Sequence, residues 1–135
     1  PDGEIFFNFD RRLISQALIN LIKNSSESIF LLHKNDNSGV INISLENKPD
    51  CVIIKIADNG TGFPKSDLDK LLEPYYTTRE MGTGIGLSVV KNIIEVHKGE
   101  LYLKNDIMPD KKIIGAIVEI ILPKSLDSNS EKIND

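Results

Sequence analysis

Two glycine-rich runs are the first groups in this sequence whose spacing could do chemistry. Asp58-Asn59-Gly60-Thr61-Gly62 follows an apolar run, and Gly82-Thr83-Gly84-Ile85-Gly86 opens a stretch with a helical pattern. Glycines at a helix start let the backbone approach a ligand closely, and the free N–H groups there favour an anion. Neither run has the spacing of a dinucleotide fingerprint, and neither contains the Gly-Lys-Ser/Thr of a P-loop. Taken alone, each is weak evidence, because a turn before a helix explains it about as well.

A polar stripe on the first helical segment could bind a metal ion. Gln16, Asn20 and Asn24 recur at four-residue spacing, and Glu27 and Ser28 extend that face by one turn. The stripe lies beside the apolar face, and asparagine is costly to bury without a partner. One interpretation is a solvated face. The other is that a side-chain amide oxygen beside a phosphate site holds Mg²⁺, whose octahedral shell is normally completed by waters and phosphates.

Charged groups in two further places could contact a nucleotide. Asp58, directly after an apolar run, could accept a hydrogen bond from an exocyclic amine such as that of adenine, or it could cap a turn. Pro74-Tyr75-Tyr76-Thr77-Thr78-Arg79 ends on an arginine whose forked guanidinium suits a phosphate. Arg11 and Arg12 are interpreted as surface charges at the start of the first helix.

The elements that must position these residues alternate along the chain. Turn-forming residues and Pro123 bound the expected strands, and Asp10 is placed to cap the first helix. The long segment 58–84 has a weak pattern, which is typical of a functional loop, with a short helical piece near 66–72. Gly99 is suited to cap the second helix at its C-terminus. The expected helices run from just after Asp10 to about His33 and from about Gly84 to His97. The expected strands are Ile5–Phe7, Val40–Glu46, Cys51–Ala57, Glu100–Lys104 and Ile113–Leu122.

Composition restricts the class of protein. The chain has 135 residues, 40% of them hydrophobic, and a formal net charge of −4, which excludes a disordered chain and disfavours nucleic-acid and anionic-lipid partners. A single cysteine, Cys51, cannot form an internal disulfide, and no apolar run approaches the roughly 20 residues of a membrane span. We expect one domain over 1–124 and a flexible polar tail over 125–135. The start at Pro1 suggests a piece of a longer protein.

Four features in fixed order resemble the ATP-binding catalytic domain of two-component sensor histidine kinases, in the GHKL superfamily (gyrase, heat-shock chaperone, histidine kinase, MutL). The resemblance extends from Ile5 to Pro123. The residues of its motifs are most similar to those of nitrogen-regulation sensor kinases of the NtrB/NtrY type. The matching boxes are Gln16 to Asn24 (N box), Asp58 to Gly62 (first glycine box), Glu73 to Thr78 (F box, with tyrosines for the usual phenylalanines) and Gly82 to Leu87 (second glycine box).

The resemblance implies a fold and a set of binding residues. The fold would be a two-layer α/β sandwich of the Bergerat type, with a mixed sheet covered on one face by helices and a mobile ATP lid over about 62–83. Asn24 would be the metal ligand, coordinating Mg²⁺ at the phosphates, with Asn20 supporting it, and Asp58 would bind the adenine amine. Asn24 and Arg79 are the catalytic candidates. The ATP-binding positions implied are Asn20, Lys23, Asn24, Asp58, Gly60, Gly62, Thr78, Arg79, Gly82, Thr83, Gly84, Ile85, Gly86 and Leu87.

The implied reaction is transfer of the γ-phosphoryl group of ATP to a histidine on a separate dimerisation domain of the same full-length kinase. That domain would pass the group to a response regulator. Hydrolytic relatives carry a glutamate where this chain has Asn20, which favours transfer, although Glu27 leaves hydrolysis open. The domain itself would be monomeric, cytoplasmic and without membrane contact, in a sensor that could be membrane-anchored. A stand-alone ATPase or serine-kinase-type relative, and a degenerate nucleotide-sensing docking module, are the alternatives.

Four remaining features depart from the family pattern or lie outside it. His33 and His97 stand at helix ends, where a dipole or cap role is the expected one. Lys98 replaces a glycine that often follows this histidine in the family. Gly115-Ala116 stands where a Gly-Thr pair commonly contacts adenine, so the lost hydroxyl would weaken nucleotide affinity.

Overall fold

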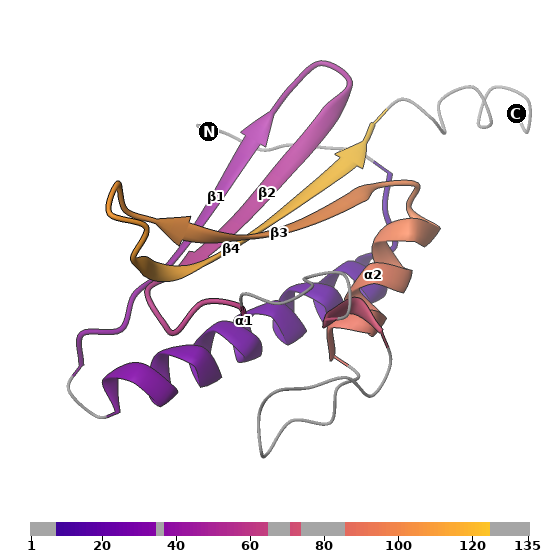
Figure 1. Cartoon of the computed structure of the whole chain (residues 1–135). Coiled ribbons are helices and arrows are strands. Elements are labelled where there is room, and N and C mark those ends of the chain that lie inside the picture. The colour runs from indigo at the N-terminus through magenta and orange to yellow at the C-terminus, as the bar shows by residue number, and fades with distance from the viewer. Residues whose placement is uncertain (1–7, 35–36, 65–70, 74–85, 125–135) are drawn as a thin grey trace, which may run out of the picture.

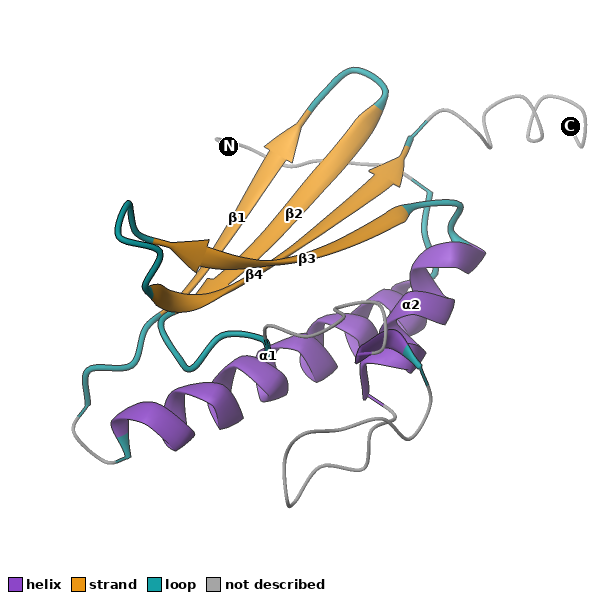
Figure 2. Cartoon of the chain, viewed as in Figure 1, coloured by secondary structure: helices purple, strands orange, loops and turns teal. Residues whose placement is uncertain are grey.

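The computed structural model describes residues 8–34, 37–64, 71–73 and 86–124. One sheet forms the first layer, and two helices lie against one of its faces as the second layer (Figures 1 and 2). This confirms the two-layer α/β arrangement expected from the sequence. Most of the segment expected to form the lid lies outside the described residues. The elements in chain order are α1 (Arg11–His33), β1 (Ile41–Asn47), β2 (Cys51–Asp58), α2 (Gly86–Val96), β3 (Glu100–Ile107) and β4 (Ile113–Pro123).

The sheet has the strand order β1-β2-β4-β3, with β2 and β4 in the centre. All three pairings are antiparallel, so the described strands do not form the mixed sheet that was expected. The strand expected at Ile5–Phe7 lies outside the described residues. The order brings the end of β2 beside the start of β4, where Ala57 pairs with Ile117.

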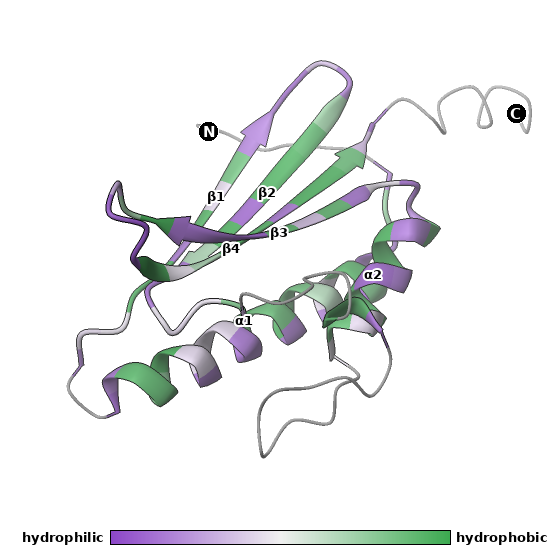
Figure 3. Ribbon diagram, in the orientation of Figure 1, coloured by the Kyte–Doolittle hydropathy of each residue, from purple (hydrophilic) through white to green (hydrophobic). Residues whose placement is uncertain are grey.

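Strand β2 places its last residue, Asp58, on the same face as the core. Its buried positions alternate, so Val52, Ile54, Ile56 and Asp58 all face the helices. Apolar residues make up much of β2 and β4 along their length (Figure 3). A carboxylate therefore stands where the apolar alternation would place one more hydrophobic side chain.

Helix α1 begins as the sequence predicts. The carboxylate of Asp10 accepts a hydrogen bond from the Leu13 N–H at 3.1 Å, which satisfies one of the free donors at the helix start. The buried side chains of Ile14, Ala17 and Leu21 then join the core. Within the described part of the chain, neither helix combines the length and the apolar character of a membrane-spanning segment.

Helix α2 ends differently from the prediction, because Lys98 and not Gly99 takes the left-handed conformation (φ 58°). Lys98 N–H bonds to the Glu95 carbonyl at 2.9 Å, and Gly99 N–H bonds to the Ile94 carbonyl at 2.9 Å, which together form a Schellman motif. Gly99 is required for another reason. A Cβ at this position would lie 2.4 Å from the Ile121 carbonyl oxygen of β4.

Candidate functional site

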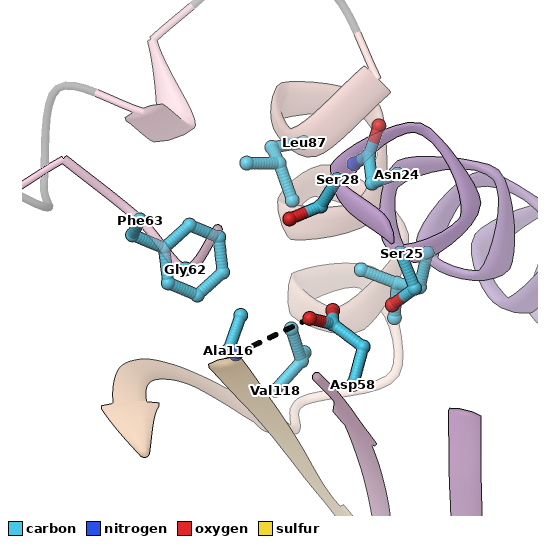
Figure 4. A pocket seen from close by; sticks show the side chains of 10 residues that line it. Asn24, Ser25, Ser28, Asp58, Gly62, Phe63, Leu87, Ala116 and Val118 are labelled. Atoms are coloured by element: carbon cyan, nitrogen blue, oxygen red, sulfur yellow. Dashed lines mark hydrogen bonds between the residues drawn. The ribbon is translucent and has the colours of Figure 1, made fainter. Parts of the chain in front are cut away.

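The carboxylate of Asp58 is fixed by two backbone donors. Its Oδ1 accepts from the Gly60 N–H at 2.9 Å and from the Ala116 N–H of β4 at 3.3 Å, and the residue is only 9% exposed. Both bonds use the same oxygen. The carboxylate points into an open space between the sheet and the helices, as Figure 4 shows, which leaves Oδ2 available to a ligand.

A pocket of about 300 Å³, including space open to solvent, surrounds this carboxylate. It lies where α1, the end of β2, β4 and the start of α2 meet (Figure 4). The lining residues are Leu21, Asn24, Ser25, Ser28, Asp58, Gly62, Phe63, Leu87, Ala116 and Val118.

The segment after β2 is held against α1 at Ser28. The Ser28 hydroxyl oxygen accepts from the Thr61 N–H at 2.9 Å and lies 3.1 Å from the Thr61 hydroxyl oxygen. A Cβ at Gly60 would lie 2.4 Å from Ser28 Oγ and 2.8 Å from the Ile29 nitrogen. Gly60 is therefore needed for the close approach of this segment to the helix, and it acts on the pocket through its neighbours.

His33 fixes the same segment from the end of α1. Its Nε2 donates to the Asn59 carbonyl at 2.8 Å, and its Nδ1 accepts from the Ser38 hydroxyl at 2.7 Å. The Asn59 side chain bonds in turn to the Val40 N–H and to the Ser38 carbonyl, both at 2.8 Å. The hydrogen bonds of His33 thus reach the segment after β2, whereas a dipole or cap role at its own helix was expected.

His97 makes the cap contact expected of it. Its Nδ1 donates to the Ile93 carbonyl in the last turn of α2 at 2.8 Å, while its Nε2 accepts from the Asp10 N–H at 2.9 Å. These partners require a neutral imidazole with its proton on Nδ1. His97 therefore also joins the end of α2 to the start of α1, a contact that the sequence pattern did not indicate.

Asn24 lies beside the start of α2. Its side chain is half-buried and lines the pocket, and a Cβ at Gly86 would lie 3.9 Å from both its Oδ1 and its Nδ2. An amide oxygen is the hard kind of ligand that Mg²⁺ prefers. The described residues contain no group of three or more His, Cys, Asp or Glu side chains that could hold a metal ion. The Asn24 amide oxygen would fit a metal held mainly by phosphates and waters, and its role as the metal ligand stays a prediction.

The structure brings together one part of the predicted site. Asn24, Asp58, Gly62 and Leu87 line the pocket, and Gly86 lies next to Asn24. Asn20 is half-buried and Lys23 is exposed, and neither is among the residues that line it, so their roles stay predictions. The predicted residues outside the described part of the chain are Thr78, Arg79, Gly82, Thr83, Gly84 and Ile85.

Several residues of the pocket were not predicted as site residues. Ser28 belongs to the polar stripe of α1, but its bond to Thr61 depends on a contact between distant segments. Ser25, one turn before it, is also buried in the pocket wall. Phe63 lies directly after the first glycine box, and its backbone is bound by Asn105 of β3. No pattern of spacing in the sequence indicates a role for Asn105.

A protein-family model and several curated proteins match the chain. The model described as "Histidine kinase-, DNA gyrase B-, and HSP90-like ATPase" matches residues 9–126. The nitrogen regulation protein NtrY of Azorhizobium caulinodans is 46% identical over 98 residues, which are 72% of this chain and 13% of that protein. A putative sensor histidine kinase NtrY-like of Rickettsia conorii is 37% identical over 128 residues, covering 94% of this chain and 20% of its own length. The chain thus spans at most about a fifth of these relatives.

Solved structures of histidine kinases have the same fold. The catalytic domain of histidine kinase ThkA, in a nucleotide-free form, superposes with a TM-score of 0.73 at 30% sequence identity, covering 91% of this chain and 74% of that one. The mycobacterial sensor histidine kinase MprB gives a TM-score of 0.72 at 24% identity, covering 85% of this chain and 74% of that one, a likeness of fold alone.

Proposed function

This chain belongs to the family of histidine kinase-, DNA gyrase B- and HSP90-like ATPases, and we propose that it binds Mg-ATP in the pocket between α1, β2, β4 and α2. Within a longer sensor kinase, it then serves as the catalytic domain that phosphorylates a histidine. The proposed domain covers 1–124, with a lid over about 62–83 and a polar tail over 125–135.

The geometry of Asp58 carries the proposal. Two backbone N–H groups hold Oδ1, so the carboxylate has a fixed direction before any ligand arrives. Oδ2 then offers a charged acceptor at the inner end of an otherwise largely apolar pocket. An exocyclic amine is the donor that such an acceptor selects, and the largely apolar walls suit a purine. We therefore assign the adenine of ATP to this end.

The phosphates belong at the other end, beside Asn24 and the start of α2. The first N–H groups of a helix have no partner within the helix and favour an anion. Asn24 would hold Mg²⁺ through its amide oxygen, and the bound metal would neutralise charge on the phosphates. Arg79, Thr78 and the glycine run 82–86 are proposed to complete this end.

The chemistry is phosphoryl transfer, to which the chain contributes positioning and electrostatics. A nitrogen of the acceptor imidazole forms a bond to the γ-phosphorus as the bond from that phosphorus to the bridging oxygen breaks, and ADP leaves. His33 and His97 are poor acceptors, because each already uses both ring nitrogens in hydrogen bonds. We place the acceptor on a dimerisation domain of the same kinase, which passes the group to a response regulator in the cytoplasm.

The decisive experiment mixes the chain with γ-labelled ATP, Mg²⁺ and the histidine-bearing domain of its own full-length kinase. Acid-labile, base-stable label on that domain is expected. Steady release of inorganic phosphate without the acceptor domain would instead support a stand-alone ATPase. ATP binding without either product would support a nucleotide-sensing module, and absence of binding would refute the proposal altogether.

A further inference from the structure

We propose that Asn105 is a positioning residue of the nucleotide pocket, which holds the backbone of Phe63 so that its ring forms one wall of the adenine end. This inference rests on the proposed function and extends it to a residue outside all four sequence boxes. Asn105 lies on β3, distant in the sequence from the segment that it binds.

The side chain of Asn105 binds both backbone groups of one residue. Its Oδ1 accepts from the Phe63 N–H at 2.6 Å, and its Nδ2 donates to the Phe63 carbonyl at 3.1 Å. Pairing with one N–H and one carbonyl requires a side chain that carries a donor and an acceptor at fixed spacing. The primary amide of Asn105 supplies both, whereas an ionised aspartate in the same place could only accept.

The register of the sheet places this amide next to the adenine end. Leu101 and Leu103 pack on the core from β3, and Asn105 follows them on the same face, so an apolar pattern is interrupted by an amide. Asn105 pairs with Ala116 of β4, whose N–H donates to Asp58. The carboxylate and the amide are therefore aligned by the same pair of strands.

Gly62 leaves room for this contact. Its φ is +79°, a conformation that favours glycine, and a Cβ there would lie 2.9 Å from Asn105 Oδ1. The chain then turns so that the Phe63 ring lies in the pocket wall together with Leu87 and Ala116 (Figure 4). An aromatic ring held in this way offers a large apolar face to a planar base at little entropic cost.

The test replaces Asn105 with alanine and measures ATP affinity by calorimetry with Mg²⁺ present. Loss of two hydrogen bonds is expected to weaken ATP binding about tenfold, with the transfer rate at saturating ATP changed less than about twofold. Asn47→Ala is the matched control, because that asparagine also binds across the sheet, to Lys124, but outside the pocket. Its affinity should stay within about twofold of wild type.

A double-mutant cycle separates positioning from general destabilisation. If Asn105 acts through Phe63, then Asn105→Ala should weaken ATP binding less than about twofold in a Phe63→Ala background. A full tenfold loss in that background would overturn the assignment. Hydrogen exchange of the Phe63 amide should also accelerate in Asn105→Ala and not in Asn47→Ala.

Two further outcomes are distinguishable. If Asn105→Ala does not fold, Asn105→Asp keeps the acceptor and loses the donor, and we expect it to weaken ATP binding about threefold. If wild type binds no ATP, the proposed function fails and this inference with it. If wild type binds ATP and each folded Asn105 variant binds it equally well, the proposed function stands and the role of Asn105 is wrong.

Discussion

The two ends of the pocket differ in how firmly hydrogen bonds within the protein hold their residues. At the adenine end, the backbone from Asp58 to Phe63 is fixed by hydrogen bonds to α1, β3 and β4. At the phosphate end, the Asn24 amide makes no hydrogen bond to any residue that the structure describes. Under the proposed function, the protein fixes its own atoms where the base would be recognised, and it leaves the Asn24 amide free where the phosphates and the metal would supply the partners. Binding and catalysis should therefore respond separately to substitution.

Asn24→Ala should have the largest effect and should act on catalysis. Loss of the amide oxygen removes the protein ligand proposed for Mg²⁺, so we expect phosphoryl transfer to fall at least about 100-fold. Labelled phosphohistidine on the acceptor domain measures this rate. Asn42→Ala, an exposed asparagine on β1, serves as the control and should transfer normally. If phosphoryl transfer is unchanged in Asn24→Ala, residues other than Asn24 bind the metal and the phosphates.

Asp58→Asn should act on recognition of the base. The amide can still accept at Oδ1, so the fold is preserved, but the charged acceptor facing the pocket is lost. We expect ATP affinity to fall roughly 10- to 100-fold and the preference for ATP over GTP to shrink. Calorimetry with both nucleotides measures this change. Asp50→Asn, at the other end of β2, is the control and should change the affinity for neither nucleotide. If Asp58→Asn keeps the wild-type preference for ATP over GTP, the adenine does not bind at this end of the pocket.

Ser28→Ala should weaken the adenine end mainly through the backbone of the segment after β2. The Thr61 N–H loses its acceptor, which should lower the free energy of unfolding by about 1 kcal/mol and ATP affinity by about threefold. Urea unfolding with and without ATP measures both effects. Ser26→Ala, on the exposed side of the same helix turn, is the matched control. Equal behaviour of the two variants would mean that the contact with Thr61 contributes little.

Lys98→Gly should have the smallest effect and should leave both ends of the pocket unchanged. Glycine adopts the left-handed conformation found at this helix end without the steric cost of a Cβ, so the free energy of unfolding should rise by about 1 kcal/mol. Thermal or urea unfolding measures the gain. Lys98→Ala removes the charge but keeps the Cβ, and it should give no such gain. If Lys98→Ala is stabilised as much as Lys98→Gly, the gain in stability comes from loss of the charge and not from the backbone conformation.

The features that the sequence predicts correctly depend on neighbours along the chain. Asp10 caps α1 through a bond to Leu13, three residues ahead, and the alternation of β2 brings Asp58 to the core face. The contacts that the sequence did not predict join distant segments. Nothing near Asn105 indicates that it binds Phe63. Likewise, a local rule favours Gly99 as the left-handed residue of the helix cap, but Lys98 takes that conformation. Glycine is required at position 99 because a Cβ there would clash with the Ile121 carbonyl of β4.

The strand order has a consequence for how the chain folds during synthesis. β2 gains its second neighbour only from β4, whose partner residues are separated from it in the sequence by the whole of α2 and β3. The hairpin of β1 and β2 and helix α1 are complete on the ribosome long before that pairing is possible. Contacts of such long range form slowly, because the intervening loop must close first. We therefore expect the carboxylate of Asp58 to receive its second backbone donor, from Ala116, late in folding. The proposed ability to bind ATP would then be acquired late as well.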